Sequence, residues 1–208
     1  MKLKIRSPKA SAFTLIEMIG VLAVIAILAS LLIPKVFEAI NDARVNSAAV
    51  GCNTVKTAVT YHFAKFGTLL SNGGVALTTG VGAATNFDKV LVSEGYLDKA
   101  FIVKIGDGSA NTRIEIVPGQ SSATAATPSN TAYDLDGIVS TPLNDAGPAG
   151  SSVVQAVITG VAEIDAKDLN DRLDGASLGV ALGNSDAKGR VKYAAGATTT
   201  VYIYLTHR

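Results

Sequence analysis

The 208-residue chain carries 18 Lys and Arg residues against 17 Asp and Glu residues, a net charge of +1 at pH 7. A charge so close to balance gives no reason to expect nucleic-acid binding. The single cysteine, Cys52, excludes an intrachain disulfide, and we expect its thiol to act as a small buried hydrophobe. The length allows one membrane helix and one compact domain of about 140 residues.

The segment from Phe13 to Ile33 is almost entirely apolar and follows a basic leader, residues 1–12. A helix of about 21 residues is about 30 Å long, which matches the hydrocarbon core of a bilayer. Glu17 places a carboxylate inside this segment, where an unpaired charge costs at least a few kcal/mol. The carboxylate is either a functional group with a partner or the mark of an interfacial helix end.

The order of these features differs from that of a secretory signal peptide, whose cleavage site follows the apolar segment. Here three small residues ending at Ala12 lie directly before the apolar segment, which begins with the run Phe-Thr-Leu-Ile-Glu. This order resembles the type IV prepilins and the pseudopilins of type II secretion. The resemblance implies cleavage between Ala12 and Phe13, N-methylation of Phe13, and Glu17 as the fifth residue of the mature chain. Pro34 then takes the place of the family's proline after the span.

The chain departs from the family pattern at two positions. The family usually has Gly directly before the cut, where this chain has Ala12, the next smallest residue. Many relatives also have Gly near the middle of the span, where this chain has Ala26, with Gly20 earlier. Pro34 remains, and it can kink a helix because it removes one backbone hydrogen bond.

From Lys35 to about Phe66 the pattern stays helical, because apolar or small residues return at spacings near three and four. This stripe consists of Val36, Ile40, Ala43, Ala48, Cys52, Val55, Val59 and Phe63. Gly67 is a natural end for the helix. Counted from Phe13, the helix is about 80 Å long. We expect the stripe to be a packing face rather than a ligand site.

The next part of the chain predicts a loop, a short helix and a hairpin. Residues 68–86 are rich in Gly, Thr, Ser and Ala and indicate a loop, and residues 87–97 suggest a helix that breaks near Gly95. Residues 101–105 and 112–117 look like two strands of a hairpin with Asp107 and Gly108 in the turn. Residues 121–130 are low-complexity, and we assign them no structure.

The C-terminal part predicts a strand, a helix and a closing hairpin. Residues 153–161 are β-branched and suit a central strand. Residues 164–175 predict a helix with Asp165 as N-cap and Gly175 directly after its end. Residues 190–193 and 199–205 predict the closing hairpin, around residues 194–197.

This order of elements resembles the pilin fold, which implies an α+β class in which a long N-terminal helix packs on a small antiparallel sheet. We expect four parts. A leader over residues 1–12 is removed, and a transmembrane and polymerisation helix covers residues 13–33. The amphipathic outer half of the helix covers residues 34–66, and a globular head domain covers residues 67–208.

Aspartates are the only candidates for a metal. Four of them, Asp165, Asp168, Asp171 and Asp174, could suggest Ca²⁺, and some pseudopilins bind Ca²⁺ in C-terminal loops. A spacing of three along a helix spreads these side chains, so an N-cap and a solvated face fit them better. Asp134 and Asp136 lie in a predicted loop where ligands converge more easily, although the full calcium-loop spacing is missing. They are left as weak candidates.

The sequence offers no catalytic constellation. His62 and His207 are the only histidines, and a nucleophile needs one of them as a neighbouring base. Cys52 and His62 are ten residues apart on one predicted helix, too far along its axis to touch. No serine motif, phosphate loop or zinc spacing is present. We therefore expect a protein that is not an enzyme and has no cofactor, with Ca²⁺ as the single candidate.

The resemblance implies a structural subunit of a type IV pilus-like filament, either a type IV pilin or a type II secretion pseudopilin. Its partners would be copies of itself, other pilin-like subunits, the prepilin peptidase and methyltransferase, an inner-membrane assembly platform and membrane lipid. The precursor would cross the bacterial inner membrane once with its leader in the cytoplasm, and the filament would lie in the periplasm or on the cell surface. The alternative is a non-polymerising single-span membrane protein with an extracytoplasmic binding domain.

Overall fold

The computed structural model describes residues 13–69, 86–108, 112–119, 126–136 and 151–208. The chain divides into two compact units between Asn41 and Asp42. The first unit is the N-terminal part of one long helix. The second unit contains the rest of that helix and all described strands.

Helix α1 covers Leu15–Phe66, 52 residues that continue without interruption through Pro34. The predicted helix is therefore confirmed. In the structure it begins at Leu15, two residues after the predicted start at Phe13. The helix is long and apolar enough to cross a membrane, and no residue of its most apolar window is buried within the chain. The apolar side chains of the first unit therefore require either lipid or another protein surface to cover them.

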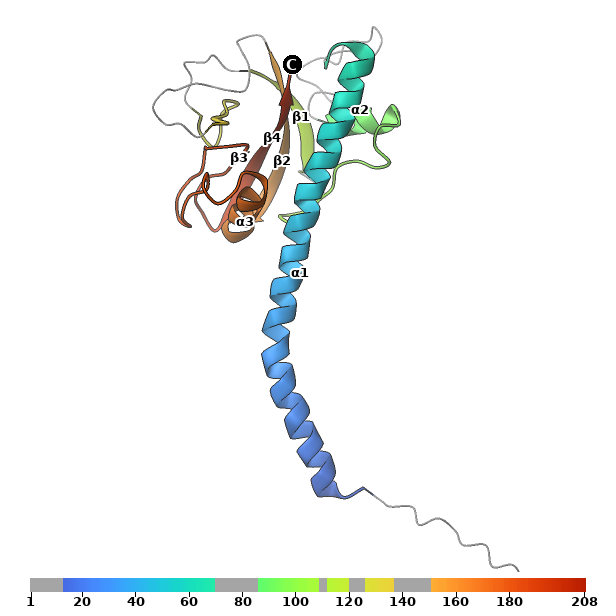
Figure 1. Ribbon diagram of the computed structural model, residues 1–208, viewed down its shortest axis with the longest axis vertical. Coiled ribbons are helices and arrows are strands. Elements are labelled where there is room, and N and C mark those ends of the chain that lie inside the picture. The colour runs from blue at the N-terminus through green and yellow to red at the C-terminus, as the bar shows by residue number, and fades with distance from the viewer. Residues whose placement is uncertain (1–12, 70–85, 109–111, 120–125, 137–150) are drawn as a thin grey trace, which may run out of the picture. The chain divides into compact units, whose positions relative to one another are not determined.

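The second unit is built on a four-stranded sheet with the strand order β1-β2-β4-β3, in which every neighbouring pair is antiparallel. The strands are β1 (Arg113–Pro118), β2 (Ser152–Ala162), β3 (Val191–Lys192) and β4 (Thr198–His207). Figure 1 shows the sheet beside the part of α1 that belongs to this unit. The α+β class and the inner position predicted for residues 153–161 are confirmed.

The main core lies between one face of the sheet and α1. The predicted stripe is confirmed from Ala48 onward, since Ala48, Cys52, Val55 and Val59 are all buried. The prediction was wrong closer to the span, where Val36, Ile40 and Ala43 are exposed. Helix α1 buries a further set at the same 3.6-residue period, and sequence reasoning missed these residues as core: Val45, Ala49, Ala58 and His62.

The predicted hairpin at residues 101–117 is wrong in its first half. Only β1 forms, and it pairs with β2, where Ile116 lies opposite Val154. Residues 101–105 do bury alternate side chains (Phe101, Val103 and Ile105), which is why the pattern resembled a strand. The backbone of this segment instead bonds elsewhere, and the amide of Phe101 donates to Asp88 Oδ2 at 3.0 Å.

The short helices lie close to their predicted places. Helix α2 covers Phe87–Ser93 and is followed by Gly95 at φ 78°, the predicted break. Helix α3 covers Glu163–Leu173 and is followed by Gly175 at φ 84°, as expected for a residue after a helix end. Asp165 is not the N-cap, because β2 runs straight into α3 and Ala162 takes that place. The closing hairpin of β3 and β4 is confirmed, with Lys192 opposite Tyr202.

A fragment of residues 42–208 should fold as a soluble monomer, because the buried face of α1 finds its sheet within this unit. Cys52 reports on that fold, since burial raises the pKa of its thiol to about 12. We expect almost no reaction with an aromatic disulfide reagent at pH 8, and full reaction in denaturant. Aggregation of the fragment, or a native thiol as reactive as a free one, would show that the packing of α1 on the sheet is wrong.

Candidate functional site

The N-terminus of α1 is closed by a reciprocal pair of side chains, Thr14 and Glu17. The carbonyl oxygen of Thr14 accepts from the amide of Met18 at 3.2 Å, which makes Thr14 the N-cap. The amide of Glu17 donates to Thr14 Oγ1 at 3.4 Å. In return, the amide and the hydroxyl of Thr14 each donate to Glu17 Oε2 at 2.8 Å. This arrangement is a capping box, which occupies amides that a helix end leaves without intrahelical partners.

The capping box changes how the carboxylate of Glu17 sits in its apolar surroundings. The amide and the hydroxyl of Thr14 both donate to Oε2, so hydrogen bonds from the chain itself take the place of water at that oxygen. Within the described part of the chain, Oε1 receives no hydrogen bond and is free to accept from another molecule. Sequence reasoning singled out Glu17 but missed Thr14. The signal was present as a threonine three residues before a glutamate at the start of an apolar run.

The other residues predicted for this site are placed only in part. Phe13 lies directly before the capped end and is 79% exposed. Ala12 lies outside the described residues, so the geometry of the Ala12–Phe13 bond is not defined. Pro34 lies inside α1, which continues past it. Cleavage at Ala12, methylation of Phe13 and a kink at Pro34 stay predictions.

The two histidines have structural partners. His62 Nδ1 lies 2.6 Å from Glu94 Oε2, and its ring packs against Phe66 and Phe87, so it joins α1 to the end of α2. His207 Nδ1 lies 2.5 Å from the hydroxyl of Tyr204. Neither contact includes a cysteine or a serine. These contacts give no chemical role to either histidine.

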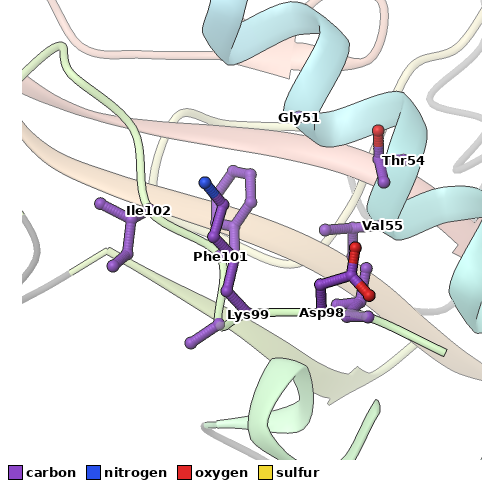
Figure 2. Close-up of a pocket in the computed structure, with 9 residues that line it drawn as sticks. Gly51, Thr54, Val55, Asp98, Lys99, Phe101 and Ile102 are labelled. Carbon is purple, nitrogen blue, oxygen red and sulfur yellow. The ribbon is translucent and has the colours of Figure 1, made fainter. Parts of the chain in front are cut away.

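One hollow of about 200 Å³ opens beside α1 in the second unit. Figure 2 shows it between Gly51, Thr54 and Val55 of the helix and the segment from Leu97 to Ile102. A Cβ on Gly51 would lie 3.3 Å from a ring carbon of Phe101, so the glycine allows this segment to approach the helix closely. The charged groups at the hollow belong to Asp98 and Lys99, which form no recognisable catalytic set.

The part of the chain that the structure describes contains no assembled metal site. No three His, Cys, Asp or Glu side chains gather there closely enough to hold an ion. Asp134 forms an isolated bridge with Lys188, and its carbonyl accepts from the amide of Gly189 at 2.6 Å. A calcium ion at Asp134 and Asp136 stays a prediction.

Helix α1 is capped by Thr14 and Glu17 and is long and apolar enough to cross a membrane. Residues 7–33 match the family model described as the prokaryotic N-terminal methylation motif. That motif is the hallmark of the prepilin-type segment of type IV pilins and pseudopilins, and this chain carries it. No curated protein and no solved structure matches the chain.

Replacing Thr14 by Ala should loosen the first turn of α1, because the loss of an N-cap side chain costs about 1 kcal/mol. We expect the amides of Glu17 and Met18 to exchange about fivefold faster in detergent micelles, measured by NMR or mass spectrometry. Thr14→Ser should keep wild-type exchange because it keeps the hydroxyl. Ser30→Ala is the matched control, since it removes a span hydroxyl bonded only to the carbonyl of Ile27. Equal exchange in Thr14→Ala and wild type would contradict the capping box.

Proposed function

We propose that this chain is a structural subunit of a type IV pilus-like filament, either a type IV pilin or a type II secretion pseudopilin. The observation that carries the proposal is the methylation motif over residues 7–33, joined to a continuous helix with one carboxylate at its start. A protein that only needed an anchor would gain nothing from that carboxylate, which an apolar span penalises.

Assembly follows from the chemistry of Phe13 and Glu17. Cleavage after Ala12 creates an amine on Phe13, one residue before the capping box. The amide of Thr14 is not the bond that is cut, so the box survives processing with its two bonds to Oε2. The amine of an incoming subunit then binds Oε1 of a neighbour's Glu17. Each charge neutralises one that the bilayer penalises, so docking is favoured over the isolated subunit.

The remainder of the span exchanges lipid contacts for contacts between helices. Small residues let helix backbones approach closely, and they recur along the span at Gly20, Ala23, Ala26 and Ala29. The proposed partners are copies of this chain, other pilin-like subunits, a prepilin peptidase and methyltransferase, and an inner-membrane assembly platform. The precursor lies in the inner membrane and the filament in the periplasm or on the cell surface.

The competing function is a monomeric single-span protein with a binding head. It makes the Ala12–Phe13 junction and Glu17 dispensable, whereas the filament requires both. The two functions therefore give opposite results in the following two experiments.

The mature chain should begin at Phe13, with or without an added methyl group, when it is isolated from membranes and its N-terminus is determined by mass spectrometry. Ala12→Gly should be cleaved at least as well as wild type. Ala12→Glu should stay uncut, because a bulky charge replaces a small residue at the cleavage site. An unprocessed wild-type chain, or normal maturation of Ala12→Glu, would remove the prepilin interpretation of the leader.

Glu17→Ala should still be inserted and cleaved, because it makes the span more apolar and lies beyond the cut. Filament yield in sheared fractions should fall sharply at matched protein levels, because the amine of an incoming Phe13 loses its partner. Glu17→Gln should be nearly as defective, since an amide carries no charge. The matched control is Glu38→Ala, which removes an exposed carboxylate of the same helix. Wild-type filament yield from Glu17→Ala alone would reject the docking mechanism but not the family assignment.

A further inference from the structure

The hollow of about 200 Å³ beside α1 is smaller than the cavities of about 300–1,000 Å³ that hold small-molecule ligands. Its size suits one or two side chains of another protein. Ile102, which lines it, is exposed, and so are Val50 and Tyr61. These two lie on the same side of α1 as Thr54 of the hollow, because they are four and seven residues away from it. Exposed apolar side chains grouped around a hollow are the pattern of a contact surface.

The described part of the second unit has one other group of exposed large apolar side chains. Ile164 lies at the start of α3 and Leu182 in the loop that follows α3, and they are 56% and 53% exposed. A hydrogen bond joins the two places, since the amide of Gly183 donates to Oε1 of Glu163. We call Ile164 and Leu182 the knob.

The hollow and the knob lie towards opposite edges of the head. The edge strands of the sheet are β1 and β3. Helix α2, which precedes the hollow segment, packs against β1, whereas α3 packs against β2, β3 and β4. Figure 1 shows α2 and α3 on opposite sides of α1. A copy therefore cannot fill its own hollow. Two copies joined through these surfaces leave one hollow and one knob free, so the contact can repeat along a filament.

Basic side chains surround the hollow. Lys99 lines it next to Asp98 (Figure 2), and Lys104 is exposed two residues after the hollow segment ends. The Nζ of Lys65 lies 5.8 Å from the ring centre of Tyr96, directly before that segment. Within the described part of the chain, none of the three lysines forms an ion pair. The hollow therefore has an excess of positive charge.

The surroundings of the knob are acidic. The two cations of α3 are already paired, Lys167 with Asp171 at 2.7 Å and Arg172 with Asp42 at 3.0 Å. Asp168 lies one turn after Ile164, on the same side of α3. Burial and then the nearby carboxylates outweigh Arg172 and raise the pKa of Asp168, so this side chain gains from an incoming cation.

We propose that the hollow of one copy receives the knob of a second copy of this chain, with the lysines at the hollow facing the carboxylates of α3. The contact rests on the proposed filament and fixes how each head is turned relative to the next. A contact built on two side chains buries less than the roughly 1,000 Å² of a stable interface, so isolated heads stay monomeric. Packed spans hold neighbouring heads close, and this high effective concentration lets a weak contact form.

The test is thiol cross-linking of sheared filaments that carry Ile102→Cys and Leu182→Cys in the same full-length chain. A short bis-maleimide should link the hollow of each copy to the knob of the next and give a ladder of covalent multimers. The native Cys52 does not compete, because it is buried. The matched control is Ile102→Cys with Ser129→Cys, since Ser129 is exposed in residues 126–136 on the other face of the sheet. This pair should give monomers.

Monomers alone from the Ile102 and Leu182 pair, in filaments of normal yield, overturn the head contact and leave the filament in place. Dimers from either single variant indicate a contact between like surfaces and also overturn it. A ladder of equal strength from the control pair does the same. Absence of filaments from the wild-type chain is a different result, because it rejects the proposed function itself.

Charge reversal is the second measurement. Lys99→Glu should lower filament yield about fivefold, because it places a carboxylate opposite those of α3. Adding Asp168→Lys to this variant should recover most of the yield. Lys56→Glu, on an exposed lysine of α1 that does not line the hollow, should keep the wild-type yield. Normal yield from Lys99→Glu, or no recovery in the combined variant, overturns the proposed contact.

Discussion

An ionised carboxylate is tolerated in an apolar helix only where donors are available, and this constraint organises the N-terminal unit. Amides without intrahelical partners exist only in the first turn of a helix. Glu17 is the third residue after the N-cap Thr14, where the side chain can reach back to that turn. One turn further along, at Gly20, the amides already serve the helix. The cost of the carboxylate is therefore smallest at the position where the chain has it, and the same bonds fix where α1 begins.

Helix α1 meets two different demands along its length. In the first unit its apolar side chains are exposed, and in the second unit one face is covered by the sheet. The covering depends on small residues, since Ala48 and Ala58 are buried against the sheet and Gly51 admits the ring of Phe101. The second-unit part of α1 is covered by the sheet of its own chain, whereas the apolar side chains of the first-unit part need lipid or neighbouring helices to cover them. In the filament proposed above, neighbouring helices would replace lipid around these side chains.

The sequence predicts elements best where one local rule decides the outcome. The long apolar helix, its end at Gly67, the strand β2 and the glycine after α3 all follow from apolar length, periodicity or a positive φ. The false strand at residues 101–105 shows the limit, because alternation reports which side chains are buried and not where the backbone bonds. Asp165 failed as an N-cap because β2 leaves no loop before α3. Thr14 was readable from the sequence, but the partners of Lys192 and His62 lie far away in the chain and only the fold brings them together.

The match to the methylation motif ends at residue 33, so the chemistry of the head has to be understood from its own contacts. The two faces of the sheet are covered by different kinds of contact. The face towards α1 is an apolar core, whereas on the opposite face residues 126–136 contribute Tyr133 and Leu135 to a small cluster with Val153 and Tyr204. Hydrogen bonds supplement this cluster, because the hydroxyl of Tyr133 donates to Gln155 Oε1 at 2.7 Å and Lys192 Nζ donates to the carbonyl oxygens of Asn130 and Ala132, each at 2.6 Å. Polar bonds from β2 and β3 therefore add to the small apolar cluster in attaching residues 126–136 to the sheet, and only the fold brings these partners together.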